Sequence, residues 1–97
     1  MTPRVTVYKL RLYVAGDAQN SAQAAANLLA LCEQHLPNRY QIELVNVFRE
    51  PERALADAIF MTPTLLKLSP PPVRRIVGTL SPMQPVLDAL GLKTNAE

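Results

Sequence analysis

The sequence predicts an α/β domain whose strands and helices follow one another in the order βαβαββα. Three observations lead to this prediction. Two segments rich in β-branched and aromatic residues alternate with two segments whose apolar residues recur at helical spacing. Two short apolar runs then flank three consecutive prolines, and a last helical segment ends at a glycine. A chain of 97 residues has the length of one domain, which we expect to span residues 1–97.

Two strands are expected in the first half of the chain, at residues 5–14 and 40–48. Both are rich in strand-forming side chains, and each is bounded by turn-forming residues. Because the side chains of a strand alternate between its two faces, each strand has an inner and an outer set. In the first strand one face carries Tyr8, Leu10, Leu12 and Val14, and in the second strand one face carries Ile42, Leu44, Asn46 and Phe48.

The segment between these strands is expected to form a helix that ends before Pro37. Asn20 or Ser21 can cap its first turn, and Gln23 stands three residues after Asn20, as in a capping box. Proline cannot continue a helix, so Pro37 ends it. The apolar stripe is expected to consist of Ala22, Ala25, Leu29, Cys32 and Leu36, widened by Ala26, Leu28 and Leu31.

Residues 51–60 are expected to form a short second helix. Pro51 suits the first helical position because the N–H group that proline lacks has no helical partner there. The apolar side of this helix is expected to be Leu55, Ala58 and Ile59.

The rest of the chain predicts a hairpin and a last helix. Residues 64–68 and 73–78 are expected to be antiparallel strands on either side of the triple proline. Ser81 can cap a helix over residues 82–90, and Gly91 can end it. The apolar stripe of this helix is Met83, Val86, Leu87 and Leu90.

This order of elements is the order of the thioredoxin fold. In that fold the redox cysteines lie between the first strand and the first helix, where the helix N-terminus lowers a thiol pKa. The corresponding residues 15–21 contain no cysteine. Cys32, the single cysteine, falls on the apolar side of the predicted helix and is expected to be a core residue. Disulfide chemistry is therefore not expected.

Other function classes are disfavoured by composition. The net charge is +2 and the chain has five aromatic residues, three Tyr and two Phe, so a nucleic-acid partner is not expected. A single histidine, His35, does not make a metal site. No run approaches the roughly 18 apolar residues of a membrane span. We therefore expect a soluble cytoplasmic protein without cofactor, metal or enzymatic activity.

Two features of the hairpin region suggest interactions. Pro63 stands just before the predicted third strand, where thioredoxin-like proteins place a cis-proline, although a simple turn proline is the alternative. Lys67, Arg74 and Arg75 make the densest basic cluster of the chain. Such a cluster is either a solvated face of the hairpin or a surface for an acidic partner.

Taken together, these segments resemble the KaiB family of circadian clock proteins. The resemblance runs from about Val5 to Leu92 and is carried by LRLYVAG, by TPTLLKLSPPPVRRIVG and by LS after Thr79. It implies a metamorphic protein with two arrangements: a ground state, often tetrameric, of order βαββααβ, and the thioredoxin-like order, which binds partners. Residues from about 51 onwards would change secondary structure. The prolines that could slow this change are Pro63, Pro70, Pro71 and Pro72.

The resemblance also implies partners. They are the hexameric ATPase KaiC, bound on its N-terminal ring, and KaiA, whose capture lowers KaiC phosphorylation; a dimer or tetramer of the chain is a further possibility. The positions that match the KaiC-facing surface are Lys67, Arg74 and Arg75. Gln41 and Glu43 lie on the second strand, an edge that the family uses for partner contacts.

Several residues depart from the family pattern. Glu43 stands where a lysine is usual, Gln41 where a small residue is usual and Thr79 where an aspartate is usual, while residues 93–97, expected to be a flexible tail, are not acidic as in the family. These departures bear on partner identity, and on KaiA capture above all. Three functions remain: a clock regulator that binds a KaiC-like ATPase, a KaiB-like stress-adaptation protein with other or fewer partners, and a thioredoxin-fold enzyme, which the missing cysteine pair disfavours.

Overall fold

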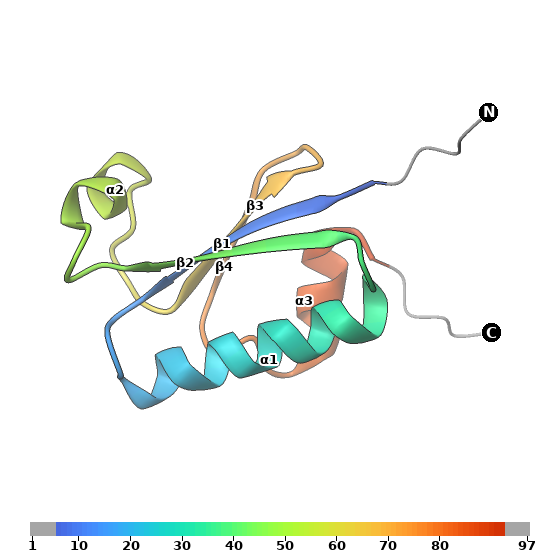
Figure 1. Ribbon diagram of the computed structural model, residues 1–97, viewed down its shortest axis with the longest axis horizontal. Helices are drawn as coiled ribbons and strands as arrows, with labels where there is room; N and C mark the ends of the chain where they lie inside the picture. Colours follow the sequence, from blue (N-terminus) through green and yellow to red (C-terminus); the bar gives the residue numbers. More distant parts are fainter. Residues whose placement is uncertain (1–5, 93–97) are drawn as a thin grey trace.

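The structure is a computed structural model that describes residues 6–92 (Figure 1). The predicted start of the first strand at Val5 and the expected flexible tail at 93–97 lie outside the described residues. The observed order of elements is βαβαββα, so the thioredoxin-like prediction is confirmed and the structure does not adopt the alternative βαββααβ order. The elements are β1 (Tyr8–Val14), α1 (Gln19–His35), β2 (Tyr40–Asn46), α2 (Pro51–Ala56), β3 (Thr64–Ser69), β4 (Arg74–Val77) and α3 (Met83–Leu90).

The four strands form one sheet in the order β2-β1-β3-β4. β1 and β2 are parallel and are joined through α1, whereas β3 runs antiparallel to both β1 and β4. Figure 1 shows α1 and α3 on one side of the sheet and α2 on the other side, beyond the far ends of β1 and β2. The sheet therefore has two differently covered faces, and β2 and β4 are its two edges.

The main hydrophobic core lies between the sheet and the helices α1 and α3. The inward face predicted for β1 is confirmed, because Tyr8, Leu10 and Leu12 are buried there. The predicted stripe of α3 is also confirmed, and Gly91 ends that helix in the left-handed region at φ 78°. The core residues are Tyr8, Leu10, Leu12, Ala24, Leu28, Leu31, Cys32, Leu36, Leu65, Leu80, Val86, Leu87 and Leu90.

A smaller cluster lies on the opposite face of the sheet, which we call the α2 face. It consists of Tyr13, Val45, Ala54, Ile59 and Leu66. α2 itself contributes one buried residue, Ala54. The helix α2 therefore adds little apolar surface to this face.

The start of α1 differs from the prediction. The helix begins at Gln19 with Ala18 at its N-cap and has no side-chain cap, so capping by Asn20 or Ser21 is wrong. Ser21 lies inside the first turn and is buried, and its Oγ accepts a hydrogen bond from the Ala15 N–H at 3.0 Å. The hydroxyl thus fixes the loop before the helix rather than the helix terminus.

The buried stripe of α1 is also displaced from the prediction. Leu28 and Leu31, expected at the margin, are fully buried, whereas Ala22 and Leu29 are exposed. The run of alanine and leucine is apolar on nearly every side, so its spacing alone does not select a face. The orientation of α1 on the sheet selects the row that begins at Ser21.

Two further element ends differ from the prediction. α2 ends at Ala56, because Ala58 adopts a left-handed conformation at φ 57° that a helix cannot contain. Within α2 the buried residue is Ala54, and Leu55, which was predicted to be buried, is exposed. At α3 the N-cap is Pro82 and no side-chain cap forms, so the cap predicted for Ser81 is wrong.

Candidate protein-interaction surfaces

The three basic residues predicted as one cluster lie on two faces of the β3–β4 hairpin. Lys67 pairs with Arg74 across the two strands, and the neighbouring pair joins Leu66 with Arg75. Because side chains alternate along a strand, Lys67 and Arg74 lie on the face of α1 and α3, while Arg75 lies on the α2 face. The expectation of a single cluster is therefore wrong. The role of each residue in partner binding remains a prediction.

Lys67 and Arg74 form a pair of like charges. Lys67 is 4% exposed, and within residues 6–92 neither cation has an acidic side chain at ion-pair distance. The pKa of Lys67 is lowered, first by burial and then by the charge of Arg74. Arg74 is the exposed member of the pair, so a carboxylate of another molecule that reaches Arg74 would reduce this repulsion.

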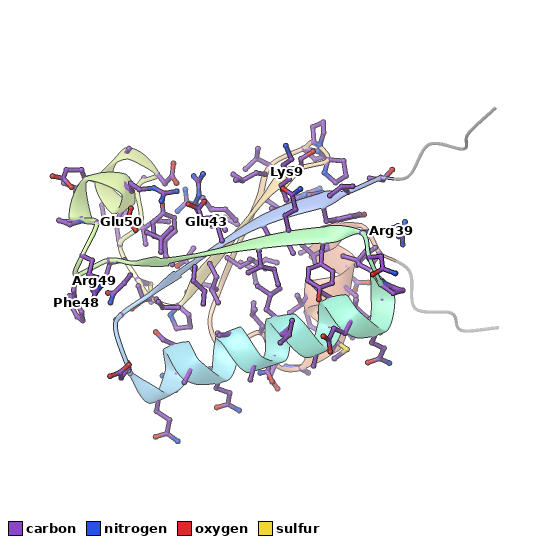
Figure 2. The ribbon with its side chains drawn as sticks, in the orientation of Figure 1. Lys9, Arg39, Glu43, Phe48, Arg49 and Glu50 are labelled. Carbon is purple, nitrogen blue, oxygen red and sulfur yellow. The ribbon has the colours of Figure 1, made fainter. Side chains whose placement is uncertain are left out.

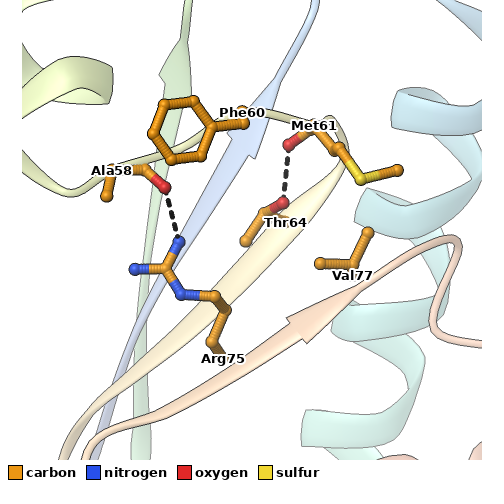
Figure 3. Close-up of a pocket in the computed structure, with 6 residues that line it drawn as sticks. All are labelled: Ala58, Phe60, Met61, Thr64, Arg75 and Val77. Atoms are coloured by element: carbon orange, nitrogen blue, oxygen red, sulfur yellow. Dashed lines mark hydrogen bonds between the residues drawn. The ribbon is translucent and has the colours of Figure 1, made fainter.

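Arg75 is already bonded within the chain. Its guanidinium donates to the carbonyl oxygen of Ala58 at 3.0 Å (Figure 3) and to that of Asp57 at 2.7 Å. These carbonyls follow the last turn of α2, where the helix leaves its acceptors without partners. Arg75 thus ties the connection between α2 and β3 to the edge strand β4.

Glu43 is the centre of an ion network on the α2 face of the sheet (Figure 2). One carboxylate oxygen lies 2.9 Å from Nε of Arg11 on β1, and the other lies 2.7 Å from a guanidinium nitrogen of Arg53 on α2. The hydrogen bonds from Arg11 and Arg53 lower the pKa of Glu43. Glu43 therefore links α2 to two strands.

Asp57 completes the network. Its carboxylate lies 3.0 Å from a guanidinium nitrogen of Arg11 and accepts a hydrogen bond from the Tyr13 hydroxyl. The pKa of Asp57 is lowered, mainly by that hydrogen bond and further by Arg11, and burial raises the pKa of Tyr13. Arg53 also pairs with Glu50 at 3.2 Å. Ionic contacts thus hold α2 where apolar contacts are few.

Sequence reasoning missed this network, although one signal for it was present. Arg11 and Glu43 are direct neighbours in the parallel pairing of β1 with β2. Opposite charges at neighbouring positions of two strands attract, so a strand alignment would have identified this pair. Gln41, two residues before Glu43, lies opposite Lys9 and is exposed on the same face.

The prolines predicted to matter lie at the two ends of β3. The Thr62–Pro63 peptide bond is cis, so the cis-proline interpretation holds over the simple turn proline. Pro63 is buried, and its carbonyl oxygen accepts a hydrogen bond from the Gly78 N–H at 2.9 Å. The Ser69–Pro70 and Pro71–Pro72 bonds in the β3–β4 turn are also cis.

The thiol of Cys32 is placed as predicted, in the core. It is fully buried in the second half of α1, and burial raises its pKa to about 11. His35 occupies the last turn of that helix. Across residues 6–92 no group of three or more potential metal ligands is gathered in one place. None of the helices in this part of the chain is long and apolar enough to cross a membrane.

Solved structures confirm the class of fold. Chloroplastic thioredoxin z has a TM-score of 0.71 at 17% identity, with 94% of this chain and 95% of that chain covered. The N-terminal domain of Synechococcus elongatus SasA has a TM-score of 0.64 at 21% identity, with 100% of this chain and 97% of that domain covered. The fold is thus thioredoxin-like.

The particular family follows from sequence comparison. Residues 11–92 match the family model described as the KaiB domain. The circadian clock protein KaiB3 of Synechocystis sp. is 43% identical over 83 residues, which are 86% of this chain and 79% of that protein. The circadian clock oscillator protein KaiB of Prochlorococcus marinus (strain MIT 9313) is 46% identical over 92 residues, 95% of this chain and 76% of that protein. The chain belongs to the KaiB family of circadian clock proteins.

Proposed function

We propose that this KaiB-family protein binds a KaiC-like ATPase in the cytoplasm and thereby modulates the phosphorylation state of that ATPase. The observation that carries this proposal is the pair formed by Lys67 and Arg74, two adjacent cations without an acidic partner in residues 6–92. An acidic loop of the ATPase would supply the missing anion. Membership of the KaiB family makes clock proteins the expected class of partner.

The Glu43 network favours a second candidate with a changed partner set. KaiA capture would use the β2 edge around Gln41 and Glu43, but the Glu43 carboxylate is bound to Arg11 and Arg53. At this edge a partner would contact a glutamate whose charge is neutralised by two arginines, where the resemblance implies that a lysine is usual. We therefore propose that KaiA binding is weaker than in clock relatives, or that another protein takes its place, as in a stress-adaptation role.

No catalytic step is proposed. Thiol chemistry requires an accessible thiolate, whereas Cys32 is buried with a pKa of about 11. A disulfide reductase assay should therefore give the same background rate for the parent protein and Cys32→Ser. A higher rate for the parent would contradict this expectation.

The proposal includes the change of secondary structure that the family resemblance implies. Its support is that α2 buries a single residue, Ala54, so little apolar contact opposes a rearrangement of α2 itself. Pro63 and the prolines at 70–72 flank β3, which lies in the part of the chain that would change. Rotation about X–Pro bonds is slow in general. Relaxation between the two forms, followed by NMR, should be faster in Pro71→Ala, and an unchanged rate would exclude the Pro70–Pro71 bond as the slow step.

The test of the main proposal separates binding from stability. Lys67→Met keeps the apolar stem and removes the charge, so the fold should remain while ATPase binding weakens. Arg74→Glu should weaken binding further through repulsion, and wild-type binding should weaken as salt rises. The matched control is Arg49→Glu, an exposed residue beyond β2 (Figure 2), which should bind as the wild type does.

Fluorescence anisotropy against the ATPase at two salt concentrations gives these affinities, and gel separation of the phosphorylated ATPase gives the functional readout. Equal binding by Arg74→Glu and Arg49→Glu would contradict the assignment of the Lys67–Arg74 pair.

A further inference from the structure

The edge of the sheet at β4 has an open side. β4 is the last strand in the order β2-β1-β3-β4, so within residues 6–92 no strand pairs with its outer backbone. Val77 in β4 and Val73 just before it are half exposed or more, at 50% and 61%. An unpaired edge with apolar side chains is a template for another extended segment.

A hollow of about 370 Å³ adjoins this edge on the α2 face (Figure 3). Phe60 and Met61, from the loop before β3, are 84% and 64% exposed beside it. This loop is fixed by the Thr64 hydroxyl, which donates to the Met61 carbonyl oxygen at 2.6 Å. The hollow is lined by Ala58, Phe60, Met61, Thr64, Arg75 and Val77.

A second hollow of about 540 Å³ lies on the same face. Leu66, Leu68 and Val73 contribute to its walls, and Ala58 and Arg75 line both hollows. The Arg75 side chain therefore stands between two mainly apolar depressions.

The charge of Arg75 is not neutralised within the described chain. Its guanidinium donates to two carbonyl oxygens, but no carboxylate lies within ion-pair distance among residues 6–92. Along the edge, Val73, Arg75 and Val77 occupy alternate positions and point to the same face. The edge thus presents an apolar, a cationic and an apolar side chain in a row.

We propose that this edge binds an extended segment of a partner protein in which an acidic residue is flanked, at alternate positions, by apolar residues. The segment would add a strand to β4 through backbone hydrogen bonds. Its carboxylate would face Arg75, and its two apolar side chains would meet Val73 and Val77 as cross-strand neighbours. The Arg75 side chain lies on the face opposite Lys67 and Arg74, so this site uses contacts other than those of the Lys67–Arg74 pair.

The test uses the full chain with isotopically labelled methionine and valine methyl groups. The probe is the acetylated and amidated peptide Thr-Val-Thr-Glu-Thr-Val-Thr, and the control peptide carries lysine in place of glutamate. We expect the glutamate peptide at millimolar concentration to shift the Met61, Val73 and Val77 methyl signals. The lysine peptide should bind about fivefold more weakly, in keeping with cross-strand ion pairs.

Matched variants of the chain test the two chemical elements of the site. Arg75→Glu should reverse the preference, so that the lysine peptide binds better, whereas Arg74→Glu on the other face should keep the wild-type preference. Phe60→Ser should weaken binding of both peptides. Phe48→Ser removes another highly exposed phenylalanine, which does not line the hollow, and should leave binding unchanged.

Absence of methyl shifts with the glutamate peptide would overturn the proposal, as would equal affinities for the two peptides. Shifts at Met61 and Val77 that follow the protein concentration without peptide would show that a second copy of the chain occupies the edge. That outcome would also overturn the acidic-segment proposal.

Discussion

The face of the sheet under α1 and α3 buries thirteen residues in one core, while the α2 face buries five. The cover of the first face is a long helix and a second helix with three buried side chains. The cover of the second is a six-residue helix held by Arg11, Glu43, Arg53 and Asp57. Apolar burial is insensitive to modest changes of pH and salt, whereas exposed ion pairs respond to both. The two faces should therefore respond differently to the same perturbation.

The largest effect is expected from truncation on the face of α1 and α3. Leu28 is fully buried, so Leu28→Ala removes packed methyl groups and should lower the free energy of unfolding by about 2–5 kcal/mol. Urea unfolding followed by circular dichroism measures the loss. Leu29→Ala, at a 46% exposed neighbour, should cost less than about 1 kcal/mol. Equal losses of unfolding free energy in the two variants would mean that Leu29 is buried, as the sequence predicted.

A smaller effect is expected from charge reversal on the α2 face. Glu43→Lys would place a third cation beside Arg11 and Arg53, so α2 should loosen from the sheet. We expect less than roughly half the loss of unfolding free energy caused by Leu28→Ala, because these side chains are partly solvated. Amide hydrogen exchange should accelerate at residues 53–59 and stay slow in α1. Uniform acceleration would contradict a separate response of the two faces.

Acid should act on the α2 face in the same direction but more mildly. The pKa values of Glu43 and Asp57 are lowered in the folded chain, so their ionised forms favour the folded state at neutral pH. This contribution is lost as pH falls from about 5 through the lowered folded-state values. The Val45 methyl signal should shift over this range while that of Leu28 does not.

Asp57→Asn serves as the control for this titration, because it removes one of the two carboxylates. It should reduce the pH-dependent shift at Val45. An identical titration in Asp57→Asn would exclude Asp57 as a contributor.

The smallest effect is expected at Cys32. Burial raises its pKa to about 11, so little thiolate exists at pH 8 and the native chain should react very slowly with a disulfide reagent. Reaction should become rapid only when urea unfolds the core. Rapid reaction of the native chain would show that the core under α1 opens as readily as the α2 face.

The sequence correctly predicted the buried side of a helix where the spacing of its apolar residues leaves a single apolar side. In α3 the spacing of Val86, Leu87 and Leu90 defines a single buried side, and the structure has it. In α1 the prediction was right at Cys32 and Leu36 but wrong at Leu29, because Leu28 and Leu29 are equally apolar and only the sheet beneath the helix distinguishes them. The early end of α2 had no sequence signal, because alanine rarely adopts the left-handed conformation that Ala58 has.

The interaction residues were harder to predict, for a geometric reason. Adjacent basic residues such as Arg74 and Arg75 look like one patch in a sequence, but in a strand they point to opposite faces. Arg11 and Glu43 are 32 positions apart in the sequence, and their ion pair depends on how β1 and β2 align. Side chains that act together across a sheet are brought together by register, which single-sequence patterns do not contain.

The hydrogen bonds from Arg75 to the carbonyls of Asp57 and Ala58 have a thermodynamic consequence. Arg75 is a residue of the edge strand β4, and its guanidinium also holds the residues that follow α2. One side chain therefore takes part both in the proposed binding edge and in the docking of α2. Any ligand whose affinity depends on where that guanidinium sits will bind with different strength to the docked and the loosened α2. By thermodynamic linkage, binding of such a ligand must change the equilibrium between docked and loosened α2 by the ratio of the two affinities.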